Sequence, residues 1–351
     1  MLKAILGGTT TNKKKSRIKE GDSVSKIWGK FAAIALCVAV SCGVSLAQVP
    51  PLTMLEIDLE NRVNYVTDVF DVTKFATDLL KAPTAARNFT TGIRLGDIVA
   101  VNGRPAKGTH VARFQNVNLN TAPTPGQAIA DTTAVFIWEQ TYQILQPDGT
   151  LIGSIMAAGL GGGPSESAAG DNTILGGTGA FIGVRGQSSR APQLSAPRNA
   201  SVTEDPANRR RNGGGTARVL LQLIPLSRPE IITTQSGPAI AHSNDFSLVT
   251  AARPARPGES LSLFATGLGP TRPGVDPGKP FPANPLAVVN SPVEVTVNGK
   301  PAEVTAAVGY PGAVNGYQVN FRLPADAASG LATIQLSAAW ITGPEVRVAV
   351  Q

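Results

Sequence analysis

The residues best suited to do chemistry are a glycine-rich stretch and a few ionisable side chains. Leu175–Gln187 reads LGGTGAFIGVRGQ, a spacing that would hold a pyrophosphate if a buried strand preceded it and a helix followed it. The polar loop SESAAGDN precedes it instead, and Pro192 and Pro197 follow. Because proline interrupts a helix, and a helix N-terminus would have to hold the phosphate, we predict no nucleotide cofactor. The glycines are interpreted as structural, at tight turns or close backbone approaches: Gly176, Gly177, Gly179, Gly183 and Gly186.

The content of histidine and cysteine argues against a metal centre or a catalytic triad. His110 and His242 are the only histidines and lie in different predicted domains, while Cys37 and Cys42 both lie in the N-terminal apolar segment. A histidine-based zinc site needs more ligands, and no G-x-S-x-G motif presents a nucleophilic serine. We therefore predict no metal and interpret both histidines as ordinary surface or turn residues. No pair of carboxylates marks a glycosidase site.

The segments that must position any site alternate as strands do. Ile93–Val101, Thr109–Leu119 and Thr132–Leu145 have period two, and Asn102-Gly103 predicts a hairpin turn. Thr73–Arg87 predicts a short helix that ends at a proline.

One face of Thr132–Leu145 is aromatic, with Phe136, Trp138 and Tyr142, and it also carries Gln140. We expect it to line the inside of a barrel as a pocket wall, with plain core packing or a subunit contact as the alternatives. Arg113 and Glu139 are the nearest ionisable candidates for the pocket, and either could equally point outward.

The central stretch also resembles the signature of the allene oxide cyclase and dirigent superfamily. The resemblance rests on LGGTGAFIGVRG and on FIWEQTYQIL and PDGTLIGSIMAAG before it, and covers about residues 63–226. It implies an antiparallel eight-stranded barrel with an apolar cavity that steers ring closure or coupling of a small substrate.

Gln187–Thr216 is expected to be a flexible polar insertion in which Arg209–Arg211 form a solvated charge cluster.

The remainder, about residues 229–351, predicts a separate β domain. Short strands alternate with Pro- and Gly-rich turns. The segments ATGLGPT and YQVNFRLP resemble an immunoglobulin-like domain of the TIG type, found at the ends of secreted acidobacterial proteins. The resemblance implies a β-sandwich for docking, presentation or export. We expect a cut near Arg228 to leave two folding units.

The N-terminal segment predicts export. Residues 1–30 carry a net charge of +6, the apolar run Phe31–Leu46 follows, and Ser45-Leu46-Ala47 is a small-x-small exit. Residues 1–47 are thus interpreted as a signal peptide cleaved before Gln48, with residues 48–62 as a lead-in to the barrel. The alternatives are an uncleaved inner-membrane anchor and lipoprotein processing at Cys42. The mature chain has a net charge of only +1 against +7 for the whole, so the basicity does not indicate nucleic-acid binding.

We therefore expect an all-β bacterial protein that is secreted, periplasmic or on the cell surface. Three hypotheses about its function stay open. The barrel binds a small apolar ligand; or it is an isomerase or dirigent-like protein without metal or nucleotide; or the chain is an adhesion protein that acts through its C-terminal domain. Self-association through the barrel and a cell-surface partner for the C-terminal domain are compatible with all three.

Overall fold

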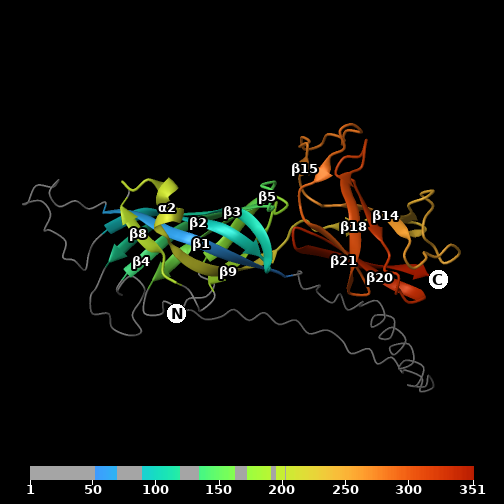
Figure 1. The fold of residues 1–351 in the computed structure, drawn as a ribbon, viewed down its shortest axis with the longest axis horizontal. Helices are drawn as coiled ribbons and strands as arrows, with labels where there is room; N and C mark the ends of the chain where they lie inside the picture. The colour runs from blue at the N-terminus through green and yellow to red at the C-terminus, as the bar shows by residue number, and fades with distance from the viewer. Residues whose placement is uncertain (1–51, 69–88, 119–133, 163–171, 191–194, 202) are drawn as a thin grey trace, which may run out of the picture. The chain divides into compact units, whose positions relative to one another are not determined.

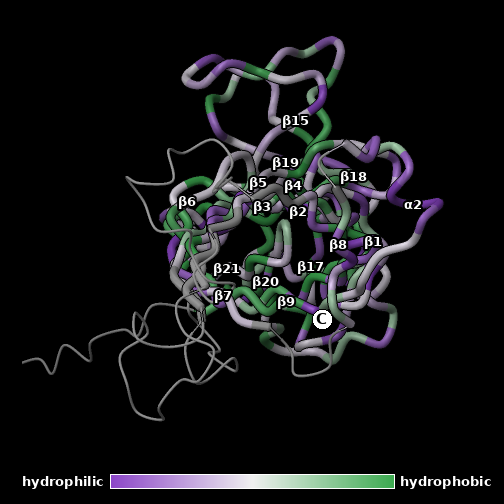
Figure 2. Tube along the Cα trace, turned by 90° about the vertical axis from the view of Figure 1, so that its left-hand side faces the viewer, coloured by the Kyte–Doolittle hydropathy of each residue, from purple (hydrophilic) through white to green (hydrophobic). Residues whose placement is uncertain are grey.

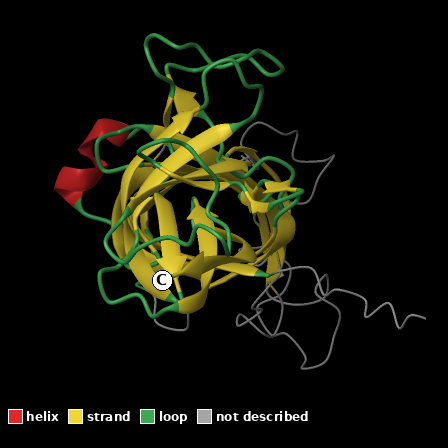
Figure 3. Cartoon of the chain, turned by 90° about the vertical axis from the view of Figure 1, so that its right-hand side faces the viewer, coloured by secondary structure: helices red, strands yellow, loops and turns green. Residues whose placement is uncertain are grey.

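The computed structural model describes residues 52–68, 89–118, 134–162, 172–190, 195–201 and 203–351. By its internal contacts the chain divides into Met1–Pro50 and Pro51–Gln351, and the described residues belong to the second unit. The predicted signal peptide and the predicted helix Thr73–Arg87 lie outside the described residues. Strands make up most of the regular structure of this part, with only short helical segments (Figures 1 and 3).

Eight antiparallel strands close into a barrel in the order β2-β3-β4-β5-β6-β7-β9-β1, and β1 pairs again with β2. These strands are β1 (Thr53–Asp68), β2 (Phe89–Val101), β3 (Arg104–Asn118), β4 (Ala134–Leu145), β5 (Leu151–Gly162), β6 (Asn172–Gly179), β7 (Arg185–Arg190) and β9 (Gly215–Ile224). The predicted all-β barrel is therefore confirmed as an architecture.

Alternation along the strands fills the barrel with apolar side chains. In β9 every second residue is buried, including Val219, Leu221 and Leu223, as a strand with one face on a core requires. Figure 2, coloured by residue hydropathy, shows hydrophobic and hydrophilic residues interspersed along the chain. Together with Leu55 and Ile57 of β1, these side chains form one apolar cluster.

The first barrel strand begins earlier than predicted. Residues 53–59, taken from the sequence as part of a lead-in, pair with β9 and bury Leu55, Ile57 and Leu59. This part of the prediction was wrong, because LEIDL alternates apolar and acidic residues as a strand with one buried face does. The register with β2 then shifts between Glu60 and Val63, a β-bulge that changes which side chains face inward.

The central glycine stretch forms the end of β6, a turn and the start of β7. Gly179 and Gly183 have positive φ angles of 62° and 74°, as predicted for a tight turn. Residues 180–183 are turn rather than strand, and β7 begins only at Arg185. No helix follows the glycines, since β7 pairs with β6 and β9.

Replacing Gly177 by alanine is expected to destabilise the barrel by roughly 1–3 kcal/mol. A Cβ atom there would lie 2.5 Å from the carbonyl oxygen of Phe181 and 2.7 Å from that of Ser154. Gly176→Ala is the matched control, because its nearest neighbour is the flexible Arg185 side chain at 3.2 Å. Thermal unfolding measures both, and equal losses would contradict the close approach. NAD and NADP are expected to leave the unfolding temperature of the unmodified protein unchanged.

The segment between β7 and β9 is a strap attached to the barrel. The prediction of a flexible insertion was wrong at both ends, because residues 187–190 and 215–216 belong to the paired strands β7 and β9. It contains β8 (Arg198–Ser201), η4 (Pro206–Asn208) and α2 (Arg209–Asn212), and β8 pairs in parallel with Val63–Val66 of β1. The Arg198 guanidinium donates to both carboxylate oxygens of Glu204, at 2.9 and 2.7 Å. The strap is therefore attached to β1 through backbone hydrogen bonds and has an internal ion pair.

The strap also makes ion pairs with the barrel strand β2. Arg209 and Arg210 both donate to the buried carboxylate of Asp97. The prediction of a solvated arginine cluster was thus wrong for Arg209, whose side chain is only 14% exposed. The sequence pattern could not show this, because Asp97 lies more than 110 residues away.

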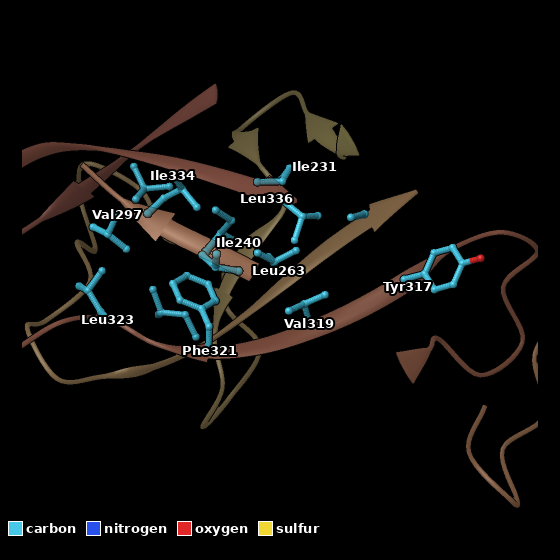
Figure 4. Packing of buried hydrophobic residues seen from close by; sticks show 14 of the residues in the cluster. Ile231, Ile240, Leu263, Val297, Tyr317, Val319, Phe321, Leu323, Ile334 and Leu336 are labelled. Atoms are coloured by element: carbon cyan, nitrogen blue, oxygen red, sulfur yellow. The ribbon is translucent and has the colours of Figure 1, made fainter. Parts of the chain in front are cut away.

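The C-terminal part is a second β structure with its own core. Its strands are β10 (Glu230–Ile231), β11 (Thr233–Thr234), β12 (Gly237–Pro238), β13 (Ile240–His242), β14 (Ser260–Thr266), β15 (Thr271–Arg272), β16 (Val288–Val289), β17 (Val293–Val297), β18 (Lys300–Gly309), β19 (Tyr317–Arg322), β20 (Gly330–Ala338) and β21 (Ile341–Val350). Leu263 and Phe321 of β14 and β19 pack against Ile334 and Leu336 of β20, and Figure 4 shows these side chains between the strands. We call this part the C-terminal sandwich.

Candidate functional site

The inner face of the barrel changes from apolar to polar along its strands. Going away from the β4–β5 turn, the inward residues of β4 are Ile144, Tyr142, Gln140 and Trp138. The apolar cluster includes Ile144 and Tyr142, whereas Gln140 is hydrogen-bonded to the side chains of His110 and Tyr142. At this second end the connections 69–88, 119–133 and 163–171 lie outside the described residues.

Strand register brings five polar side chains together there, and we call them the inner polar cluster. They are Arg62, Arg94, His110, Gln140 and Tyr142. His110 lies opposite Gly96 on one side and Tyr142 on the other, with the two rings stacked at 4.8 Å. A Cβ atom at Gly96 would lie 3.2 Å from Arg62 Cγ and 3.7 Å from His110 Nδ1. The missing side chain at Gly96 therefore lets Arg62 approach the imidazole.

Hydrogen bonds fix the tautomer of His110. The Tyr142 hydroxyl donates to Gln140 Oε1 at 3.0 Å, and His110 Nε2 lies 3.0 Å from the same oxygen. Since an amide oxygen only accepts, Nε2 carries the proton and Nδ1 has a free lone pair. Nδ1 is buried and has no hydrogen-bond partner among the described residues.

The electrostatic environment keeps this imidazole neutral. Burial lowers the pKa of His110 most, and the charges of Arg94 and Arg62 lower it further. The hydrogen bond to Gln140 acts in the opposite direction, and the resulting pKa is about 3. At neutral pH the site therefore contains an uncharged nitrogen base beside two guanidinium groups.

Aromatic rings form the wall next to this cluster. The Arg94 guanidinium lies 4.5 Å from the centre of the Trp138 ring, within the range of a cation–π interaction. Arg94 Nε also donates to Asn64 Oδ1 at 2.7 Å. Phe114 contacts Trp138 at a centroid distance of 5.0 Å. Arg94 is thus oriented by β1 and β4 toward the inside of the barrel.

The structure places the predicted pocket residues in two different environments. Tyr142 is buried and belongs to the apolar cluster, and Trp138 lies on the same face of β4, so this face points into the barrel. That it lines a pocket stays a prediction. Phe136 is placed in β4 only as far as its backbone. Arg113 and Glu139 lie on the outer face, 70% and 58% exposed, and pair with each other at 2.6 Å. These two residues do not line the interior, which corrects their candidacy.

Sequence reasoning missed His110, Arg62 and Arg94 as site residues and gave Gln140 no role beyond its place on the aromatic face. Both histidines are buried rather than at the surface: His110 in the barrel, and His242 in the sandwich, where it bonds to Glu259 at 2.6 Å. Period-two alternation from Phe114 through Ala112 would have placed His110 inside. No such signal existed for Arg62, because the bulge in β1 interrupts the alternation.

Within the described ranges, no three or more His, Cys, Asp or Glu side chains are grouped so that they could hold a metal ion. In the same ranges, no helix has both the length and the apolar character needed to span a membrane. In comparisons with known proteins, no family model and no curated protein matches this chain.

Proposed function

We propose that the barrel binds a small, largely apolar ligand at the inner polar cluster and that the chain is an exported protein. The observation that carries this proposal is His110 Nδ1, a buried acceptor without a partner among the described residues. Burying a polar atom unpaired costs about 1–3 kcal/mol, and a bound molecule that donates to it removes that cost. The aromatic wall beside it suits an apolar body.

The site chemistry specifies what such a ligand would offer. Nδ1 accepts a hydrogen bond, so the ligand would present a hydroxyl or an N–H group. The guanidinium groups of Arg62 and Arg94 donate, so an oxygen acceptor would lie close to the same hydroxyl. The rings of Trp138 and Phe114 would contact an aromatic or flat apolar portion.

The closed barrel and the glycine turn between β6 and β7 support an allene oxide cyclase or dirigent-like identity for the barrel. The strand order and core of the C-terminal sandwich support a TIG-type, immunoglobulin-like identity. In this proposal the sandwich docks or presents the barrel outside the cytoplasm. These identities rest on resemblance and architecture together.

An isomerase is the second candidate, and the neutral imidazole between two arginines favours it. If a ligand transferred a proton from carbon to Nδ1, the resulting enolate would lie beside Arg62 and Arg94. The imidazolium formed at His110 would be balanced by the enolate, so the net charge of the cluster and the ligand together would not change, and the arginines that oppose protonation of free His110 would stabilise the product anion.

The test uses 2-naphthol and its methyl ether as probes on the full chain. Saturable quenching of tryptophan fluorescence is expected with 2-naphthol. The affinity should be at least tenfold weaker for 2-methoxynaphthalene, and at least tenfold weaker for 2-naphthol in His110→Leu. Arg113→Gln, on the outer face of the same strand, is the matched control and should bind normally. No saturation with either probe, or equal binding by His110→Leu, would contradict the proposal.

A second arm separates binding from catalysis. 2-Tetralone has acidic C–H groups next to its carbonyl, and their exchange with D2O is followed by NMR. Exchange faster than in buffer that is lost in His110→Gln would indicate the isomerase. Binding without added exchange would indicate a ligand-binding protein only.

A further inference from the structure

Three hairpins in the described chain have two-residue turns in which both residues have positive φ. Asn102-Gly103 joins β2 to β3 with φ of 49° and 72°, and Asn298-Gly299 joins β17 to β18 with 51° and 78°. Ala339-Trp340 joins β20 to β21 with 49° and 62°. Asparagine and glycine tolerate this conformation, whereas alanine and tryptophan are strained in it. The third turn therefore has residues that its own backbone does not favour.

The third turn also differs from the other two in its burial. The side chains of Asn102 and Asn298 are exposed. Ala339 and Ile341 are 0% and 2% exposed and belong to the apolar cluster of the barrel rather than to that of the sandwich. Trp340 packs against the same barrel cluster. The strained turn is thus covered by the barrel, and apolar burial there offsets the backbone strain.

Polar contacts also join the barrel to the sandwich at the end of the barrel that carries the β4–β5 turn, which we call the turn end of the barrel. Gln146 donates to the Asn290 carbonyl, and the Asn290 side-chain amide donates to the Leu151 carbonyl at 3.1 Å. Arg272 Nη1 donates to Thr150 Oγ1 at 3.0 Å, and Arg104 pairs with Glu294. The β4–β5 turn and the start of β3 are therefore bonded to the sandwich, through Asn290 and through residues of β15 and β17.

We propose that Ala339-Trp340-Ile341 is a docking element whose partner is the turn end of the same chain's barrel. The element fastens barrel and sandwich into one cooperative folding unit, and its backbone strain is maintained by that contact. This assigns the sandwich an internal role that is independent of any ligand. It also replaces the expectation that a cut near Arg228 would leave two autonomous folding units.

The test exchanges the strained turn for the type that the chain uses elsewhere. In Ala339→Asn/Trp340→Gly the backbone strain is relieved but the apolar contact is lost. If docking dominates, the unfolding midpoint of the full chain falls by roughly 5 °C or more, and amides of β5 and β14 lose protection from hydrogen exchange together. If the turn were only a strained hairpin, the midpoint would rise, and that result would overturn the proposal.

Two further variants keep the result decisive. Asn298→Ala/Gly299→Trp places the same strained pair in the exposed turn, and should lower protection in β17 and β18 without changing that of the barrel strands. Trp340→Leu keeps the strain and shortens the apolar contact, so it should lower the midpoint in the same direction if the double variant fails to fold. Unchanged barrel protection in Trp340→Leu would also overturn the proposal.

Discussion

Lowering the pH from 7 to 4 is expected to remove about 3 kcal/mol of stability through His110 alone. The unfolded chain binds a proton at this residue with an ordinary histidine pKa of about 6.5, whereas the folded chain binds it only near the pKa of about 3. Between these values the unfolded state holds more protons, so the free energy of unfolding decreases as pH falls, by about 1.4 kcal/mol per pH unit.

The measurement compares urea unfolding of the wild type and of His110→Gln across this pH range. Glutamine retains hydrogen-bonding groups but does not titrate there, so the difference between the two curves isolates the imidazole. Parallel curves would show that His110 is not held neutral. Nitrogen NMR offers an independent check, because the chain has only two histidines: the His110 signals should show the Nε2–H tautomer unchanged from pH 7 to pH 5.

Replacing Asp97 by alanine is expected to destabilise the barrel by about 3 kcal/mol, because it leaves the charge of Arg209 largely buried without its counter-ion. Arg210 donates to Asp97 at 2.8 and 2.9 Å, and Asn61 donates at 3.0 Å. Burial would raise the pKa of Asp97, but these hydrogen bonds and the charges of Arg209 and Arg210 outweigh it and hold the pKa below its ordinary value. The stabilisation is therefore present at neutral pH and is lost in strong acid.

Asp58→Ala is the matched control for this prediction. Asp58 also accepts two hydrogen bonds from one arginine, Arg218, at 2.7 and 3.1 Å, but that arginine is 48% exposed. An exposed pair contributes about 0–1 kcal/mol, so the control should lose far less stability. Hydrogen exchange should also show that, in Asp97→Ala, the amides of β8 lose protection before those of the barrel strands. Equal losses in the two variants would mean that the strap is not held through Asp97.

The strand set could be predicted well from local pattern. The predicted strand Ile93–Val101 agrees with β2, and Asn102-Gly103 lies in a hairpin turn as expected. The site could be predicted only in part. Trp138 and Tyr142 follow from the parity of one strand, whereas the position of Arg62 depends on a bulge and on the absent side chain of Gly96.

By itself, the sequence determined the all-β class, the glycine turn between β6 and β7, and which face of β4 is aromatic, because each of these depends on residues close together in the chain. Only the tertiary structure decided that Arg113 and Glu139 face outward, since closure of the barrel sets which side of β3 and β4 is inside. It also decided that Arg209 is paired with Asp97 and that the Ala339-Trp340 turn is buried. Those contacts join residues far apart in the sequence, and neither partner carries a local signal of the other.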